Sequence, residues 1–431
     1  MLSEFVLNKS LDYKYKLSFK NKIESTVMEL SDASTLKFTY NVIGKVNKNI
    51  QDIKTQIEEI NTKIVKNENI SLMKFAKHNI FSTMRDMCVD GSDVYFGGFD
   101  GILRKVDFSV ESNPKTTWTV TLDTINNING IACDGNYLYV VDRDPKPWNI
   151  RTEGSTIGHL YVLNKEDGSI VNSVELSGKG SAITLYGNYA IVSLQIYGFA
   201  IYNISNINSI IKVFEHLQTD YNQGEFQKNK VITLGGKPYI FFASFDHGLS
   251  VWDISTISTP TKVHKLDLKA LNIAEYGGKR EQCFDLVKVD NYLYMPIAPM
   301  SAYLTDKTYR RGVIRIDLSD LAKMDNDEFE YYPIALEDWA LASGESDTTP
   351  NAIAHMDSVI AINNARLGLA LFKLNDDYSL TYIKSVKVLD GGNIRPMKYT
   401  EDGRLIMGSD NSKVSRSRLA EIYRLLFYET I

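Results

Sequence analysis

The chain has 431 residues, 44% of them hydrophobic and 23% charged, with a formal net charge of −5 and a pI of about 5.8. This composition is ordinary for a globular protein, and its acidic balance argues against a nucleic-acid partner. The sequence has no run of about 18 apolar residues that would span a membrane. Its first residues lack the basic start and apolar stretch of a secretory signal. We therefore expect synthesis in a cytoplasm and neither nucleic acid nor membrane as a partner.

Residues 1–42 show one short helical pattern around Ile23, Val27 and Leu30. This pattern could extend a following helix or dock onto another protein. We interpret residues 1–42 as a partly helical attachment segment.

A strict heptad follows in residues 43–67. Its apolar residues are separated by steps of three and four, with polar residues between them: Ile43, Val46, Ile50, Ile53, Ile57, Ile60 and Ile64. So narrow an apolar seam is typical of a coiled coil, and isoleucine at both seam positions favours three or four strands over two. We predict an α-helical stem that makes the protein a homotrimer. The alternative is a single amphipathic helix packed against the globular part.

From residue 68 the apolar period changes to two, and a paired motif repeats seven times. The first half is an apolar strand, a tight polar turn and an aromatic strand, as in IACDGNYLYVVD from Ile131. The second half usually opens with glycine and ends on an acidic or polar residue, as in GLSVWDIST from Gly248. Pairs of about 50 residues predict an all-β, seven-bladed propeller over 68–431, although five or six blades also fit. A β-sandwich is the alternative.

The seventh pair ends with the chain and lacks a fourth strand. The alternating segment 70–78 precedes the first blade, and we predict that it completes the seventh blade and closes the ring. If strands A to D run outward from the axis, the long insertions fall at the B–C and D–A connections, which emerge at one end of the ring.

These insertions carry aromatic rings beside arginines and carboxylates, a combination that suits stacking on sugars and hydrogen bonding to their hydroxyls. Packing of the loops against each other is the alternative role. The candidate ligand-binding residues are Arg143, Trp148, Tyr221, Glu225, His247, Tyr276, Arg280, Tyr303, Arg310, Arg311 and Trp339.

Motifs of enzymes and metal sites are missing from the sequence. It contains no P-loop, GxSxG, HExxH or EF-hand motif, and its six histidines show no ligand spacing. The acidic residues Glu281 and Asp285 could act as an acid–base pair, but the chain has 53 acids. Three cysteines without CxxC spacing, Cys88, Cys133 and Cys283, predict free thiols in apolar strands. We expect no metal, no cofactor and no enzymatic activity.

A coiled-coil stem leading into a propeller resembles the receptor-binding proteins of phages that infect Gram-positive hosts, particularly staphylococcal phages. The resemblance covers residues 43–431 in layout and includes no residue-by-residue binding motif. It implies a virion fibre whose propeller recognises host cell-wall carbohydrate and whose residues 1–42 contact other virion proteins. GLSVWDISTISTPTKV from Gly248 also resembles repeats of bacterial extracellular propellers. A structural virion or scaffold protein and a glycan-cleaving enzyme are the alternatives.

Overall fold

The computed structural model describes residues 49, 51, 69–80, 84–110, 113–122, 127–143, 158–218, 226–244, 248–268, 281–298, 310–335, 352–364, 368–389, 394–409 and 419–428. All seven predicted seam residues and residues 1–42 lie outside this set. Asn49 and Gln51, which are described, are helical. The trimeric stem therefore stays a prediction.

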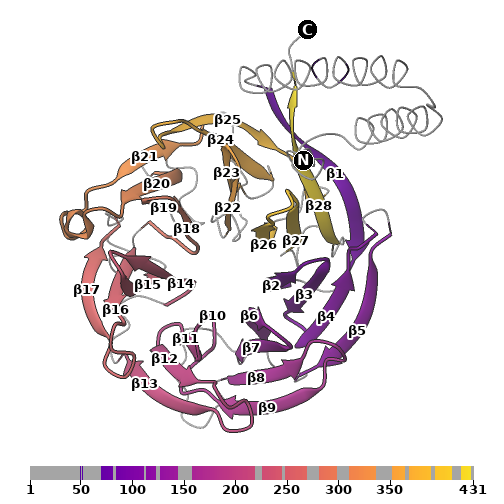
Figure 1. The fold of residues 1–431 in the computed structure, drawn as a ribbon. Helices are drawn as coiled ribbons and strands as arrows, with labels where there is room; N and C mark the ends of the chain where they lie inside the picture. Colours follow the sequence, from indigo (N-terminus) through magenta and orange to yellow (C-terminus); the bar gives the residue numbers. More distant parts are fainter. Residues whose placement is uncertain are drawn as a thin grey trace, which may run out of the picture. The chain divides into compact units, whose positions relative to one another are not determined.

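The described strands form seven four-stranded antiparallel sheets, which confirms the seven-bladed propeller. Figure 1 shows the sheets arranged around a central axis, with β2, β6, β10, β14, β18, β22 and β26 innermost. The first four blades, each from inner to outer strand, are β2 (Met84–Asp90), β3 (Asp93–Gly98), β4 (Ile102–Asp107) and β5 (Lys115–Thr121); β6 (Asn127–Asp134), β7 (Tyr137–Arg143), β8 (His159–Asn164) and β9 (Ile170–Glu175); β10 (Ala182–Tyr186), β11 (Tyr189–Ser193), β12 (Gly198–Asn203) and β13 (Ile211–Leu217); and β14 (Asn229–Leu234), β15 (Lys237–Ala243), β16 (Leu249–Asp253) and β17 (Thr261–Leu266).

The remaining three blades follow the same inner-to-outer order. They are β18 (Val287–Val289), β19 (Tyr292–Ile297), β20 (Gly312–Asp317) and β21 (Glu330–Pro333); β22 (Ile353–Met356), β23 (Val359–Asn363), β24 (Leu369–Leu374) and β25 (Leu380–Val386); and β26 (Ile394–Tyr399), β27 (Leu405–Ser409), β28 (Leu419–Tyr428) and β1 (Asn69–Asn79). A 3₁₀ helix, η5 (Leu321–Asn326), lies between β20 and β21. We call the strands of each blade A to D from the axis outward.

The last blade combines the two ends of the described chain. β1 lies beside β28 in this sheet, at the place expected for strand 70–78. Lys74 of β1 donates a hydrogen bond to Glu421 of β28 over 3.1 Å, and Glu421 is completely buried. The seventh blade also packs on the first, where Ile406 and Ile422 share an apolar cluster with Phe96. These contacts close the ring within the larger compact unit of the chain, Lys74–Thr400 and Leu405–Tyr423.

Adjacent blades pack face to face through apolar side chains. Between the third and fourth blades, the ring of Phe199 lies 4.7 Å from that of Phe242 and 5.0 Å from that of Trp252, centroid to centroid. Both faces of a B strand meet a neighbouring blade, so the B strands are largely apolar, as the buried end of β15 shows. Burial on both faces therefore explains why the aromatic strand of each repeat alternates so weakly.

The glycine that opens the second half of each repeat has a steric cause. Gly198, Gly248 and Gly368 precede or begin a C strand with φ of 109°, 71° and 90°. A Cβ at these positions would lie 1.9, 2.0 and 2.1 Å from a backbone oxygen of the D strand. Any other residue would therefore strain its own backbone and push the outer strand away.

The polar residue that ends the second half caps the turn that follows the C strand. The carboxylates of Asp107, Asp253 and Asp317 each accept a hydrogen bond from the backbone N–H of the serine two residues later, over 2.7, 2.8 and 2.9 Å. Hydrogen bonds from these serines lower the pKa of all three carboxyls. The turns are thus stabilised by ionised aspartate, and this contribution is lost as the pH falls through the lowered pKa values.

The prediction of free thiols is wrong for two of the three cysteines. Cys88 in β2 and Cys133 in β6 form a disulfide, with their Cα atoms 6.2 Å apart. The two residues are 45 positions apart and meet because the inner strands of the first two blades lie side by side. Cys283 is free and buried, and its Sγ lies 2.9 Å from the carbonyl oxygen of Gly248. Only the side-by-side placement of the first two blades identifies which cysteines can pair.

Reducing this disulfide should lower the free energy of unfolding by about 2–4 kcal/mol, because the bond restricts the unfolded chain across a long loop. Guanidinium denaturation with and without dithiothreitol measures the difference. A variant carrying Cys88→Ala and Cys133→Ala should have the same denaturation curve as the reduced protein, and dithiothreitol should not change that curve. Superimposable curves for the oxidised and reduced protein would contradict the stabilising role.

Candidate binding face

One end of the ring has longer strand connections than the other. In six of the seven blades, two residues join strand A to strand B. At the opposite end, B strands connect to C strands, and D strands connect to the next A strand. The longest gaps in the strand order occur there, including 144–158, 267–286, 298–311 and 334–352. We call this end the loop-rich end.

Three of the eleven predicted binding residues are described: Arg143, Arg310 and Arg311. The other eight, Trp148, Tyr221, Glu225, His247, Tyr276, Arg280, Tyr303 and Trp339, lie outside the described residues. Arg143 is half-buried and ends β7, opposite Asn127. All three described arginines stand at the loop-rich end, because each ends a B strand or immediately precedes a C strand.

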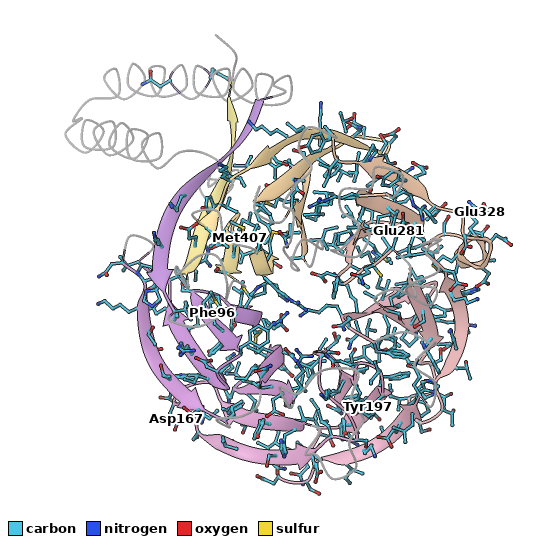
Figure 2. The ribbon with its side chains drawn as sticks, turned by 180° about the vertical axis from the view of Figure 1, so that it is seen from behind. Phe96, Asp167, Tyr197, Glu281, Glu328 and Met407 are labelled. Atoms are coloured by element: carbon cyan, nitrogen blue, oxygen red, sulfur yellow. A yellow bond between two sulfur atoms is a disulfide. The ribbon has the colours of Figure 1, made fainter. Side chains whose placement is uncertain are left out.

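Arg310 is held by a completely buried carboxylate. Its Nε and Nη2 donate to Oε2 of Glu281 over 2.8 and 2.6 Å, and its backbone N–H donates to Oε1 over 2.8 Å. Glu281, which is labelled in Figure 2, has no exposed side-chain surface, whereas 24% of the Arg310 side chain is exposed. The guanidinium also lies 4.8 Å from the ring centroid of Phe329. The pair joins the end of the 269–280 segment to the end of the 299–309 segment.

Arg311 is fully buried. Its Nη2 donates to Oδ1 of Asn364 over 2.8 Å, and its backbone N–H donates to the hydroxyl of Tyr331 over 2.8 Å. Burial lowers the pKa of Arg311 to about 10, so the guanidinium remains charged at neutral pH. These contacts tie the fifth blade to the sixth, and in this structure Arg311 supports the loop-rich end from inside.

A second anchor lies in the second blade. Asp142 is almost completely buried, and its Oδ1 accepts a hydrogen bond from the backbone N–H of His159 over 2.6 Å. The imidazole Nδ1 of His159 lies 3.5 Å from the same oxygen. Asp142 and His159 flank the segment that contains Trp148, so the Asp142 carboxylate links the two ends of this β7–β8 connection.

Sequence reasoning missed the anchoring partners. Asp142, Tyr331 and Asn364 lie in or beside ordinary strand patterns, and no local signal distinguishes them. Glu281 appeared instead as half of an acid–base pair with Asp285. The structure assigns Glu281 to Arg310 and Asp285 to the lining of a separate cavity. Buried hydrogen bonds and ion pairs therefore hold the strand ends from which the long connections start.

Among the described residues, no group of three histidine, cysteine, aspartate or glutamate side chains could hold a metal ion. None of the helices that the structure describes is long and apolar enough to cross a membrane.

Comparisons with known proteins support the repeat and the fold. The chain matches the LVIVD repeat at residues 127–146, 177–217 and 232–267, which cover parts of the second, third and fourth blades. No curated protein matches the chain.

Solved structures similar to this chain include the WD40 repeats of RRP9, with 11% identity and a TM-score of 0.56 over 83% of this chain and 100% of that one. BamB from Moraxella catarrhalis has 14% identity and a TM-score of 0.51 over 82% and 100%. The propeller domain of Doa1 has 11% identity and a TM-score of 0.52 over 82% and 97%. At these identities the likeness concerns the fold alone, so the chain is a seven-bladed β-propeller that contains LVIVD repeats.

Proposed function

We propose that this chain is a virion fibre or receptor-binding protein that recognises host cell-surface glycopolymer through its loop-rich end. The observation that carries the proposal is the concentration of long connections at one end, above a base held by buried pairs such as Arg310–Glu281. Rigid folds commonly carry their binding residues on loops of this kind. In the proposal, residues 1–42 attach the fibre to other virion proteins, and the stem makes it a homotrimer.

The disulfide supports the proposal that the mature protein is located outside a reducing cytoplasm. Disulfides persist in oxidising surroundings, including virion surfaces, and are rare in cytosolic proteins. Cys88–Cys133 is therefore consistent with a protein released in a virion. A virion or scaffold protein without receptor binding and a glycan-cleaving enzyme are the alternative functions that the experiment below must separate.

The test compares a trimer with a monomer of the full chain on susceptible cells. Replacing Ile50 and Ile57 by aspartate places charges in the predicted seam. The variant should therefore be a monomer of 48.8 kDa instead of a trimer. Because three linked sites bind by avidity, apparent affinity for cells or their purified wall polymer should fall about a hundredfold or more. Light scattering measures the mass, and a cell-sedimentation assay measures the binding.

The matched control replaces Gln51 and Gln56, which lie beside the seam positions in the heptad, by aspartate. This variant should remain trimeric and bind like the original protein. A full chain that is already monomeric would disprove the stem. A trimer that binds no host cells would favour the structural virion role, and release of sugar products would favour the enzyme.

A further inference from the structure

The axis of the propeller contains a cavity of about 390 Å³. It is lined by residues near the starts of β2, β10, β14, β18 and β22, by Ile131 of β6, and by β26 from Arg395 to Tyr399. Innermost strands begin at the loop-rich end, so most of the lining lies toward that end of the axis. Side chains with nitrogen at their tips extend from the inner strands toward the centre (Figure 2). We call this space the axial cavity.

Positive charge dominates the lining. Five cationic side chains, Arg85, Lys228, Lys230, Arg395 and Lys398, face two carboxylates, Asp86 and Asp285. Five minus two leaves a formal charge of +3, without counting His355. One carboxylate is already engaged, because Oδ1 of Asp86 lies 2.7 Å from Nζ of Lys228 and its Oδ2 accepts the backbone N–H of Ile131.

The second carboxylate is a weak counterion for the remaining cations. Asp285 accepts backbone N–H groups, from Leu286 over 2.9 Å and from Ile353 over 3.4 Å. Burial raises the pKa of Asp285, which favours its neutral form. The described lining therefore carries more formal positive charge than negative charge.

Two of the lysines, Lys230 and Lys398, contribute to this excess. Neither Lys230 nor Lys398 makes a hydrogen bond or ion pair with a residue that the structure describes. Burial is the main cause that lowers the pKa of Lys230; the nearby charge of Asp285 raises this pKa, and the charges of Lys398 and Lys288 lower it. The two lysines repel each other in a partly enclosed space and share one nearby carboxylate, Asp285, so an entering anion would stabilise them.

We propose that the axial cavity is a binding site for a small polyanion of the phosphate or pyrophosphate class, held by Lys230 and Lys398. The volume lies within the usual range for small-molecule sites, about 300–1,000 Å³. Phosphate oxygens accept hydrogen bonds from ammonium groups, and a doubly or triply charged anion matches the formal +3 of the lining. This site does not depend on the proposed receptor role.

The experiment titrates the full chain with inorganic phosphate and with pyrophosphate at low ionic strength, by calorimetry and by thermal unfolding. Lys230→Met and Lys398→Met keep most of the aliphatic stem and remove the charge. Each should weaken pyrophosphate binding about tenfold or more, and the double variant about a hundredfold or more. Lys237→Met is the matched control, because Lys237 is an exposed lysine of the same blade outside the cavity, and its affinity should stay within about twofold.

Failure to fold is not expected to obscure the result. Without anion, Lys230→Met should be at least as stable as the original protein, because it removes a half-buried charge whose loss of water outweighs its attraction to Asp285. Added pyrophosphate should raise the unfolding temperature of the original protein and of Lys237→Met, and much less that of the double variant. Absence of binding at millimolar pyrophosphate, or equal binding by all variants, would overturn the proposal. Binding to host cells is measured in a separate assay, so the anion-site proposal and the receptor-binding proposal can each fail without the other.

Discussion

Replacing Arg310 by methionine is expected to lower the free energy of unfolding by about 3–5 kcal/mol. The substitution leaves the carboxylate of Glu281, which is completely buried, without the guanidinium that now donates to it over 2.8 and 2.6 Å. An uncompensated buried charge is among the largest single-site penalties in a protein. Chemical denaturation of the full chain, monitored by tryptophan fluorescence, measures the change.

Arg315→Met is the matched control, because it makes the same substitution five residues later along the chain. Arg315 pairs with Glu330, whose side chain is 57% exposed, so solvent compensates for the lost partner. The expected loss from this ion pair is about 1 kcal/mol or less. Arg315→Met also loses the hydrogen bond to the carbonyl of Asp377 over 2.8 Å and the contact with the Tyr292 ring, but it leaves no charge buried without a partner. Adding Glu281→Gln to Arg310→Met should recover most of the loss, since glutamine removes the charge and still accepts the backbone N–H of residue 310. Equal losses from Arg310→Met and Arg315→Met would show that burial of Glu281 does not matter.

Gly248→Ala should destabilise the fourth blade by more than about 3 kcal/mol. An alanine Cβ would stand 2.0 Å from the carbonyl oxygen of Leu266, and the φ of 71° is itself unfavourable for alanine. The overlap is with backbone, so relief requires moving strand β17 away from β16. Thermal and chemical unfolding of the purified variant test the expectation.

Gly235→Ala separates the effect of the positive φ from the effect of the steric overlap with the outer strand. Gly235 has a φ of 55° and lies in the β14–β15 turn of the same blade, where an added Cβ would meet no atom of a described residue within 4 Å. The free energy of unfolding of Gly235→Ala should fall by only about 1 kcal/mol, which is the cost of placing alanine at a positive φ. Comparable stability of the two alanine variants would contradict the steric explanation for the repeated glycine.

The repeat could be predicted from sequence because its determinants are local. Gly248 opens a strand, Asp253 caps the turn at its end, and each interacts with residues of its own blade. Such short-range constraints recur from blade to blade, so the number and order of strands can be read from the residues alone. Closure of the ring by the segment before Met84 also follows from counting strands, because the seventh repeat lacks one.

Tertiary structure alone decided which distant residues meet. The disulfide joins residues 45 positions apart, Arg310 lies 29 positions from Glu281, and Arg311 lies 53 positions from Asn364. The axial cavity gathers charged residues from different blades around one axis. None of these pairings has a sequence period: Arg310 and Glu281 meet at one end of the fifth blade, whereas the disulfide and the Arg311–Asn364 contact each join two neighbouring blades. The sequence by itself therefore determined the blades, while the tertiary structure determined which residues anchor the loop-rich end and which charges gather at the centre.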